Sequence, residues 1–421
     1  MNIWYLHHYA TPTTIAGLHR PFEFAKYFQE GKNKVVVFSS SFLHYVGQNM
    51  ILDEKKYLIE EYGGIKTVYI KTCGYKTSGI KRIKNMCDYY TRLIKISKKY
   101  SKLNGAPDII IASSPHPLTM IAGIKLGKYY GAPCISEIRD FWPEVFFTSG
   151  KLKKNSFLGK ILLRSEKSIY TKSDALVFLK EGDHQYIIEQ GWDTDHGGSV
   201  DMKKCYYINN GVDIALFDKN AEENKFPDDD LENEAFKIVY CGAIRPINHV
   251  DVLVDVGKIL GNCAEILIYG TGNCVSDIEK EISEKGVTNV KLKGYIDNKY
   301  VPYVLSKSSL NILNYSSTEY NWSRGNSSNK LFEYLASGKP VVSTVKMGYD
   351  ILERYSCGVS SDGCIPELIA KAITKIQALN AEEYAGYCKR ARIAAENFDI
   401  KKLSGEYLNL IKDVISRRIS I

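Results

Sequence analysis

The sequence predicts an α/β protein built from two doubly wound domains, each with a parallel β-sheet. The chain has 421 residues, more than one hydrophobic core normally organises. Short apolar runs alternate with amphipathic helical segments along most of it, the pattern of strands covered by helices on both faces. An acidic stretch, residues 215–236, separates two such series. The overall composition, 44% hydrophobic and 25% charged, is that of a globular protein.

The first series forms the predicted N-terminal domain, residues 1–214. Its apolar runs predict strands, and the amphipathic segments between them predict helices. The expected strands are 3–6, 34–39, 65–70, 108–112, 133–137 and 175–179. The expected helices include 18–29, 118–130 and 160–173.

The second series forms the predicted C-terminal domain, residues 215–399. The expected strands are 237–241, 265–269, 290–292, 310–314 and 340–344, with helices at 250–260, 275–284, 300–306 and 330–337. Residues 215–236 hold eight acids and few apolar side chains, which predicts a solvated connector. A last helix, about 400–421, is expected to pack back on the first domain.

Positive charge is concentrated in the first half of the chain. Residues 1–200 contain 28 Lys+Arg and 18 Asp+Glu, a net of +10, whereas the whole chain carries +8. Lys76–Lys102 holds nine basic residues and one acid, with Ile80, Ile83 and Cys87 at helical spacing. This segment predicts a basic amphipathic helix, which either lies on an anionic membrane or packs on its own domain. No nucleic-acid-binding signature accompanies the charge, so no nucleic-acid partner is expected.

The cysteines and the apolar runs indicate a compartment. None of the ten cysteines forms a C-x-x-C pair, which favours buried, reduced thiols. The N-terminus does not resemble a signal peptide, and no apolar run approaches the ~20 residues that span a bilayer. We therefore expect a cytoplasmic protein, with peripheral attachment to the inner face of the plasma membrane left open by the basic segment.

Several loops that follow predicted strands are suited to phosphate. Gly17 stands just before a predicted helix, where free N–H groups and the helix dipole attract anions. Neither G-x-G-x-x-G nor a P-loop is present, which disfavours a nicotinamide or P-loop site. In the second domain Gly242 and Arg245 follow one strand, and Gly270 and Gly272 follow the next. The glycines permit close backbone approach or a tight turn, and the arginine suits a phosphate or merely lies on the surface.

The segment GNSSNKLFE, from Gly325 to Glu333, adds a third loop at the same predicted sheet edge. Ser328, Asn329 and Lys330 stand where a helix begins and offer amide groups and a cation. Three such loops on one edge predict a nucleoside-diphosphate ligand in the second domain.

Several motifs, in this order, resemble those of family 4 glycosyltransferases, which have the GT-B fold of two Rossmann-like domains facing across a cleft. The segments are YINNGVDIALF, IVYCGAIRP, ILIYGTGN, VKLKGYI and NKLFEYLASGKPVV. In the first domain, SSPHPLTMIAG and EIRDFWPE resemble the branch that contains fucosamine transferases of bacterial surface-polysaccharide assembly.

The resemblance implies a retaining, metal-independent transfer of a sugar from a nucleoside diphosphate, UDP more than GDP, to a glycan or polyprenyl-linked acceptor in capsule or O-antigen synthesis. The nucleotide-sugar is then a substrate, and no cofactor is expected. Arg245, Lys330 and the amides of Ser328 and Asn329 are expected to meet the diphosphate charge. Glu333 matches the family glutamate that binds the ribose, and Tyr295 in VKLKGYI is assigned to the donor site.

In the first domain the resemblance implies a catalytic role for His116, near the sugar and the breaking bond. His7, His8 and Asp140 are expected on the acceptor or sugar side. Each of these residues could instead be an ordinary loop side chain.

Two positions depart from the family pattern. Gly325 stands where many relatives have a sugar-binding glutamate, and Glu319 nearby does not replace it by position. Asn248 stands where a diphosphate-binding lysine is common. The sugar, or the way it is recognised, is therefore expected to differ.

Rival interpretations stay open at this point. Asp193 and Asp195 form a D-x-D, a metal-binding pattern of another transferase fold, but they follow a helix rather than a buried strand, so no metal site is expected. The alternatives are a nucleotide-sugar epimerase of the same architecture and a non-catalytic membrane- or polymer-binding protein.

Overall fold

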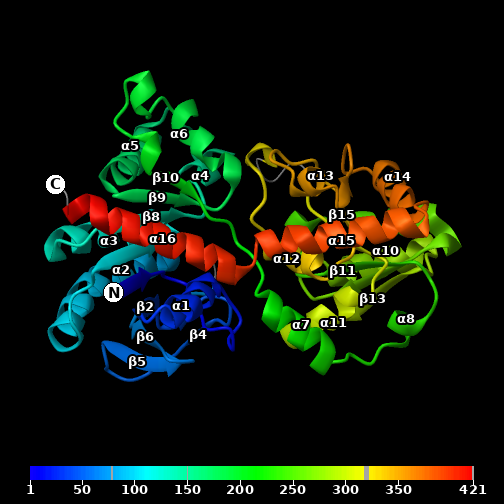
Figure 1. Cartoon of the computed structure of the whole chain (residues 1–421), viewed down its shortest axis with the longest axis horizontal. Helices are drawn as coiled ribbons and strands as arrows, with labels where there is room; N and C mark the ends of the chain where they lie inside the picture. Colours follow the sequence, from blue (N-terminus) through cyan, green and yellow to red (C-terminus); the bar gives the residue numbers. More distant parts are fainter. Residues whose placement is uncertain (77–78, 149, 317–321, 420–421) are drawn as a thin grey trace. The chain divides into compact units, whose positions relative to one another are not determined.

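The computed structural model describes residues 1–76, 79–148, 150–316 and 322–419 (Figure 1). The chain divides into two compact units. Unit 1 comprises Met1–Leu179, Asp183–Ile208 and Leu403–Ile421, and unit 2 comprises Lys180–Gly182 and Asn209–Lys402. The division therefore falls at Ile208, slightly before the position expected from the sequence. Among the described residues, no helix is long and apolar enough to cross a membrane.

Unit 1 is built on an eight-stranded sheet in the order β10-β9-β8-β7-β1-β2-β6-β5. The strands are β1 (Asn2–Leu6), β2 (Lys34–Ser40), β5 (Tyr57–Tyr62), β6 (Ile65–Ile70), β7 (Ile109–Ser113), β8 (Cys134–Ile138), β9 (Ala175–Phe178) and β10 (Cys205–Tyr207). All pairs are parallel except β5 with β6, which is antiparallel. The six expected strands are present. The edge strands β5 and β10 were not expected, because neither has a buried apolar run.

Alternation along β1 divides the core of unit 1 between the two faces of the sheet. The ring of Trp4 contacts Phe38, Tyr100 and Tyr130, on the side of α2 (Ile80–Asn104) and α3 (Pro117–Tyr130). The next residue, Tyr5, points to the other face. There Phe24 of α1 (Arg20–Glu30) contacts Tyr407 of α16 (Ile400–Ile419), so the last helix packs on unit 1. Further helices are α4 (Glu144–Thr148), α5 (Phe157–Lys172) and α6 (Gln185–Glu189), and a short hairpin joins β3 (Phe42–Leu43) to β4 (Gln48–Asn49).

A buried ion pair crosses that second face. Arg20 Nε lies 3.0 Å from Glu137 Oε2, and both side chains are almost completely buried. Glu137 also accepts hydrogen bonds from the Tyr5 hydroxyl at 3.0 Å and the Ser113 hydroxyl at 2.7 Å. Burial alone would raise the pKa of Glu137, but Arg20 and its hydrogen-bond donors hold that pKa below the ordinary value. The pair therefore joins α1 to three neighbouring strands of the sheet.

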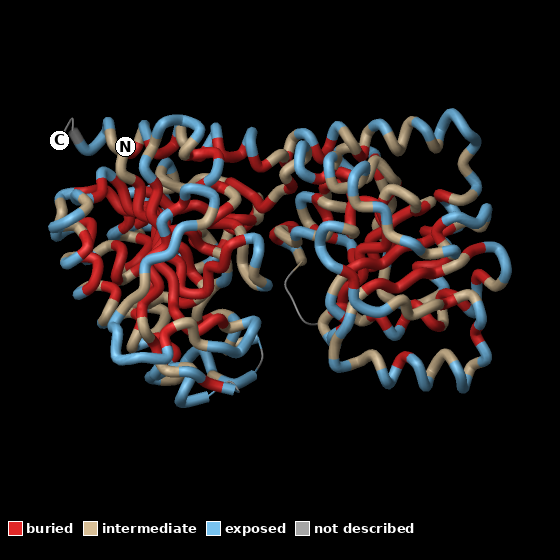
Figure 2. Tube along the Cα trace, turned by 90° about the horizontal axis from the view of Figure 1, so that it is seen from below, coloured by how far each residue is buried: buried red, intermediate tan, exposed pale blue. Residues whose placement is uncertain are grey.

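Unit 2 has a six-stranded, wholly parallel sheet in the order β13-β12-β11-β14-β15-β16. The strands are β11 (Lys237–Cys241), β12 (Glu265–Tyr269), β13 (Val290–Gly294), β14 (Leu310–Leu313), β15 (Val341–Ser343) and β16 (Gly358–Ser360). The helices are α9 (Val252–Leu260), α10 (Val275–Lys285), α11 (Val301–Ser306), α12 (Asn329–Ala336), α13 (Ile351–Tyr355), α14 (Pro366–Gln377) and α15 (Ala381–Asn397). The central strands are buried, and Figure 2 shows this red core inside each unit.

The acidic segment is not a solvated connector, and that expectation was wrong. It forms α7 (Ile214–Glu223) and α8 (Asp229–Glu232) on unit 2. Lys293 of β13 lies 2.7 Å from Asp228 and 2.8 Å from Asp230, and Lys307 lies 2.9 Å from Glu232. Three of the eight acids, Asp228, Asp230 and Glu232, are therefore neutralised by lysines that are distant in the chain.

The basic helix α2 also differs from its predicted orientation. Its buried face consists of Asn85, Met86, Tyr89, Leu93, Ile96, Ser97 and Tyr100. Ile80 and Ile83 of the predicted apolar face are 86% and 60% exposed. The helix packs on its own domain, and the first turns retain an exposed apolar strip.

Removal of one partner from the buried Arg20–Glu137 pair is expected to destabilise unit 1. Arg20→Met leaves a buried carboxylate without its cation and should lower the free energy of unfolding of unit 1 by about 3–5 kcal/mol. Arg92→Met, at the more exposed pair with Asp88, should cost less than about 1 kcal/mol. Urea unfolding of full-length variants measures both losses. Equal losses of free energy of unfolding in the two variants would show that the buried pair contributes no more to stability than the exposed one.

Candidate active site

The strand order of each sheet shows where a ligand is expected to bind. In both sheets the order reverses beside the first strand, between β1 and β7 in unit 1 and between β11 and β14 in unit 2. Ligands of open parallel sheets bind beyond the carboxyl ends of the strands at such reversal points. His8 and His116 follow β1 and β7, and Gly242 and Tyr315 follow β11 and β14. The candidate residues of each unit therefore lie where this fold binds ligands.

Lys330, in the first turn of α12, is the central cation of unit 2. Its Nζ lies 4.9 Å from the ring centre of Tyr240 and 4.6 Å from that of Tyr315, and it donates to the Tyr240 hydroxyl at 3.2 Å. With the Asn248 amide oriented to satisfy both neighbours, its oxygen accepts from Lys330 Nζ at 3.0 Å and its nitrogen donates to the Ala243 carbonyl. The neighbours that were not expected from the sequence are the two tyrosines.

The surroundings of Lys330 make its charge costly. Burial lowers the pKa of Lys330 to about 7, and the nearby Cys241 and Glu333 offset that effect only in part. An incoming anion beside this amine would restore its charge. Electrostatically, the site is prepared for a negatively charged ligand.

The first amides of α12 lie beside this lysine. Such groups have no partner within the helix and attract anions. The Ser328 amide donates to the Asn326 side chain at 2.9 Å, and the Ser328 hydroxyl bonds to the Tyr315 hydroxyl at 2.5 Å. Of the two amides expected to meet phosphate, that of Ser328 is therefore already engaged. The amide of Asn329 is the better candidate.

The three glycines of the neighbouring loops serve backbone packing. A Cβ on Gly270 would stand 1.8 Å from the Gly242 carbonyl oxygen, and one on Gly272 would stand 1.8 Å from that of Ile244. A Cβ on Gly242 would meet the Lys330 side chain at 2.8 Å. The Gly242 amide donates to the Tyr269 carbonyl at 2.9 Å. Gly242 thus lets Lys330 cross the loop, and the other two let the loops after β11 and β12 touch.

The remaining donor-site candidates surround this centre. Arg245 is exposed in the loop after β11, and its side chain has no ion pair or hydrogen bond with any residue that the structure describes. Glu333 is half-buried one turn after Asn329, in a helix fixed by the bond from the Tyr334 hydroxyl to the Cys241 carbonyl at 3.0 Å. Tyr295, after β13, is 68% exposed.

Gly325 lies in a conformation that favours glycine. Its φ is +103°, a region that side chains with a Cβ rarely adopt. A glutamate here would strain the loop, which agrees with the departure noted from the sequence. Glu319 lies outside the described residues.

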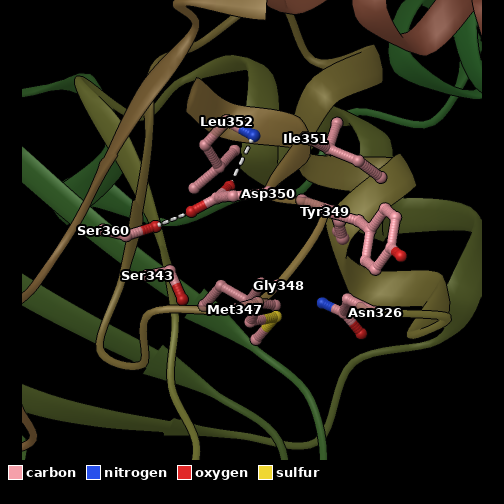
Figure 3. Close-up of a pocket in the computed structure, with 11 residues that line it drawn as sticks. Asn326, Ser343, Met347, Gly348, Tyr349, Asp350, Ile351, Leu352 and Ser360 are labelled. Atoms are coloured by element: carbon pink, nitrogen blue, oxygen red, sulfur yellow. Dashed lines mark hydrogen bonds between the residues drawn. The ribbon is translucent and has the colours of Figure 1, made fainter. Parts of the chain in front are cut away.

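A small pocket adjoins this loop at the ends of β14, β15 and β16 (Figure 3). Asn326 lines it, and its side-chain nitrogen is buried without a partner among the described residues. Asp350 accepts from the Leu352 amide at 2.8 Å and from the Ser360 hydroxyl at 2.6 Å (Figure 3). The sequence did not single out Asn326, because a buried amide nitrogen is visible only in the tertiary structure.

The three candidate histidines of unit 1, His7, His8 and His116, form one buried group. His8 Nδ1 lies 2.5 Å from His116 Nε2, and the ring of His8 is stacked on those of Tyr9 and Tyr89. His7, His8 and His116 are fully buried. Burial lowers the pKa of all three, that of His116 to about 3. These rings are therefore neutral near pH 7 and act as hydrogen-bonding groups. One ring nitrogen of each has no partner within the described residues: Nε2 of His7, Nε2 of His8 and Nδ1 of His116. The other ring nitrogen of His7, Nδ1, accepts from the Tyr9 amide at 3.2 Å.

Gly17 lies farther from its helix than the sequence predicted, whereas Asp140 follows a strand as expected. Helix α1 begins at Arg20, so Gly17 is not at its first turn, and a Cβ there would stand 2.1 Å from Thr11 Oγ1. Gly17 therefore serves the packing of its loop. Asp140 is exposed after β8 and has no hydrogen bond or ion pair with the described part of the chain.

The D-x-D segment is a local turn. Asp193 lies 2.7 Å from His196 Nδ1 and is almost completely buried. No group of three or more His, Cys, Asp or Glu side chains suited to a metal occurs in the described residues.

Comparisons with known proteins agree with this geometry. Residues 235–378, most of unit 2, match the family model described as "Glycosyl transferases group 1". No curated protein matches the chain in sequence. Similar structures include sucrose-phosphate synthase from Thermosynechococcus elongatus (14% identity, 99% of each chain covered, TM-score 0.70). Anabaena HepE in complex with UDP is similar over 98% of this chain and 100% of that one (14% identity, TM-score 0.68). A glycosyltransferase from Rickettsia africae is similar over 98% of this chain and 98% of its own (15% identity, TM-score 0.66).

The fold is GT-B. Unit 2 contains the segment that matches the glycosyltransferase group 1 model. The GT-B chain thus places the cation of Lys330 and the histidine group at the reversal points of its two sheets.

The lowered pKa of Lys330 predicts that the affinity of unit 2 for anions depends on pH. Since its pKa is lowered to about 7 and an anion raises it, affinity for inorganic pyrophosphate should fall as the pH rises above 7, by up to about tenfold per unit. Lys330→Arg stays charged and should lack this part of the slope, which corrects for titration of pyrophosphate itself. Calorimetry at several pH values measures it. Parallel slopes for the two proteins would contradict the assignment.

Proposed function

We propose that the chain is a glycosyltransferase that transfers a sugar from a nucleoside-diphosphate donor held by unit 2. One observation carries the proposal: at the reversal point of the unit 2 sheet, Lys330 lies beside the first amides of α12 and between two aromatic rings. The group 1 domain over residues 235–378 supports it.

This arrangement fits the charge that develops in the reaction. As the bond to the sugar breaks, negative charge grows on the leaving diphosphate, and fixed donors stabilise it best. Lys330 supplies a cation, Asn329 supplies a helix amide, and the exposed Arg245 can pair with a phosphate. These groups can do this work without a metal, which supports a metal-independent reaction. Retention of configuration is proposed from the motif resemblance.

The nucleoside is proposed to lie over the start of α12. Glu333, one turn from Asn329, can accept hydrogen bonds from both ribose hydroxyls. The exposed ring of Tyr295 offers an apolar surface for a base. Uracil is the proposed base, supported by the similarity to the UDP complex of Anabaena HepE and by the motif resemblance. Gly325 and the adjoining pocket are proposed to shape recognition of the sugar.

The acceptor is proposed to be a glycan or a polyprenyl-linked sugar in bacterial surface-polysaccharide synthesis. The support is the resemblance of SSPHPLTMIAG and EIRDFWPE to the fucosamine-transferase branch. In unit 1, the neutral ring of His116 is proposed to hydrogen-bond a sugar hydroxyl, and His7, His8 and Asp140 are proposed to contribute to the acceptor or sugar side. The cytoplasmic location and the contact of Lys76–Lys102 with a membrane remain proposals.

Nucleotide binding is the first test of this proposal. UDP should raise the melting temperature more than GDP or ADP does. Glu333→Gln should weaken UDP about ten- to a hundredfold, since a charged acceptor is replaced by a neutral one. Glu367→Gln, exposed on α14, is the control and should bind normally. Stabilisation by none of the three nucleotides would contradict the transferase, and an unchanged affinity of Glu333→Gln would contradict the ribose assignment.

Turnover separates transfer from the alternatives. UDP should be released from a UDP-sugar only when a suitable glycolipid acceptor is added, and Lys330→Met should lower that rate at least a hundredfold by removing the cation at the leaving group. Chromatography of donor and products measures both. An isomerised donor sugar formed without acceptor would instead identify an epimerase.

A further inference from the structure

A second basic and apolar surface lies on unit 1, away from α2. We call it the α5 surface. Its exposed apolar side chains are Val145, Phe157, Leu158 and Ile161, and its exposed cations are Lys151, Lys153, Lys154, Lys160 and Arg164. Phe157 is 83% exposed and Leu158 53%, unusual values for large apolar side chains on the same turn. These residues lie on helices α4 and α5 and on the loop between them; both helices are labelled in Figure 1.

The register of α5 turns these apolar residues outward. The helix buries Gly159, Glu166, Ile169 and Tyr170, which share one face. Glu166 on that face accepts from the hydroxyls of Tyr170 at 2.9 Å and Tyr186 at 2.8 Å. The helix therefore has a fixed inner face. Phe157 and Ile161, one turn apart, have no place on it.

The loop before α5, which carries Lys151, Lys153 and Lys154, is held against the first turn of that helix. Ser156 caps α5 by accepting from the Gly159 amide at 3.1 Å, and its hydroxyl donates to the Lys153 carbonyl at 2.7 Å. A Cβ on Gly159 would stand 2.6 Å from that carbonyl oxygen, so only glycine allows the loop this close. The cations of the loop and the apolar side chains of the helix therefore lie on one continuous surface with a fixed backbone.

Every charged side chain from residue 145 to residue 165 is a cation. No acid occurs from residue 145 to residue 165. Within the described residues, none of the five cationic side chains makes an ion pair or a hydrogen bond. A surface of unpaired cations around exposed apolar side chains is complementary to an anionic bilayer, whose headgroups meet the cations and whose acyl region receives the apolar groups.

A pocket adjoins the cations. It is lined by residues of α4, α5 and the region of α6, together with Lys154 of the basic loop: Glu144, Phe147, Thr148, Lys154, Leu163, Tyr186 and Gln190. Lys154 is the cation of this lining and Glu144 its acid, and Phe147 and Leu163 supply apolar surface. Four lysines to one arginine is also a composition that protein interfaces disfavour.

We propose that the α5 surface docks the protein on an anionic phospholipid membrane. Phe157, Leu158 and Ile161 enter the boundary between headgroups and acyl chains, and the five cations contact the lipid phosphates. This surface is distinct from Lys76–Lys102. The proposal does not depend on the transfer reaction.

Vesicle flotation of the full-length chain tests the proposal. The protein should float with phosphatidylcholine vesicles that contain phosphatidylglycerol, less so in high salt, and not with phosphatidylcholine alone. Lys153→Gln/Lys154→Gln should weaken partitioning roughly thirtyfold. Phe157→Ser/Leu158→Ser should abolish flotation. The matched control is Lys95→Gln/Lys102→Gln, which removes the same charge from exposed sites on α2 and should have a smaller effect.

Each outcome decides the matter. Unchanged melting temperature and unchanged UDP response of the variants show that a loss of flotation is local. Flotation that the α5 variants retain, or that the α2 control loses instead, would overturn the proposal. So would wild-type protein that binds RNA or self-associates through this surface without binding vesicles. Failure of UDP, GDP and ADP alike to bind, with normal flotation, would refute the proposed transferase and leave this inference intact.

Discussion

The buried ion pair of Arg20 and Glu137 is the interaction on which the site region of unit 1 depends. It joins α1 to the ends of β1, β7 and β8 through Tyr5, Ser113 and the strand that carries Glu137. The candidate residues follow within three positions of these anchors: His7 and His8 after Tyr5, His116 after Ser113, and Asp140 after Glu137. The rigidity of the pair thus determines where the chain leaves the sheet, and the histidine group can be buried and closely packed.

Unit 2 uses a cation in the opposite way. Arg20 is fully compensated by a carboxylate, whereas Lys330 has two aromatic rings, a hydroxyl and an amide around it. Such neighbours tolerate a cation without neutralising it, so the energetic balance of the site favours an added anion. The paired cation maintains structure, and the incompletely compensated one is suited to binding.

Charge also organises the surfaces of the molecule. Asp228, Asp230 and Glu232, at and just before α8, pair with Lys293 of β13 and with Lys307 after α11, which fastens this segment to the rest of unit 2. The cations beside α5 are left without acids. A cluster of like charges in the sequence therefore indicates a contact within the fold in the acidic segment and an external partner beside α5. Only the neighbours in space distinguish the two cases.

The sequence by itself determined the elements and the edge of the sheet that carries the site. Alternating apolar runs predicted every central strand, and glycines, hydroxyls and lysine after strands indicated where anions would bind, because both patterns are local along the chain. Tertiary structure decided what depends on distant neighbours. It turned the predicted apolar face of α2 partly outward and folded the acidic segment on lysines. It also engaged the Ser328 amide, gave Gly270 and Gly272 a packing role, and joined three separate histidines into one neutral group. The physical reason is that burial, charge compensation and hydrogen-bond partners are properties of neighbours in space.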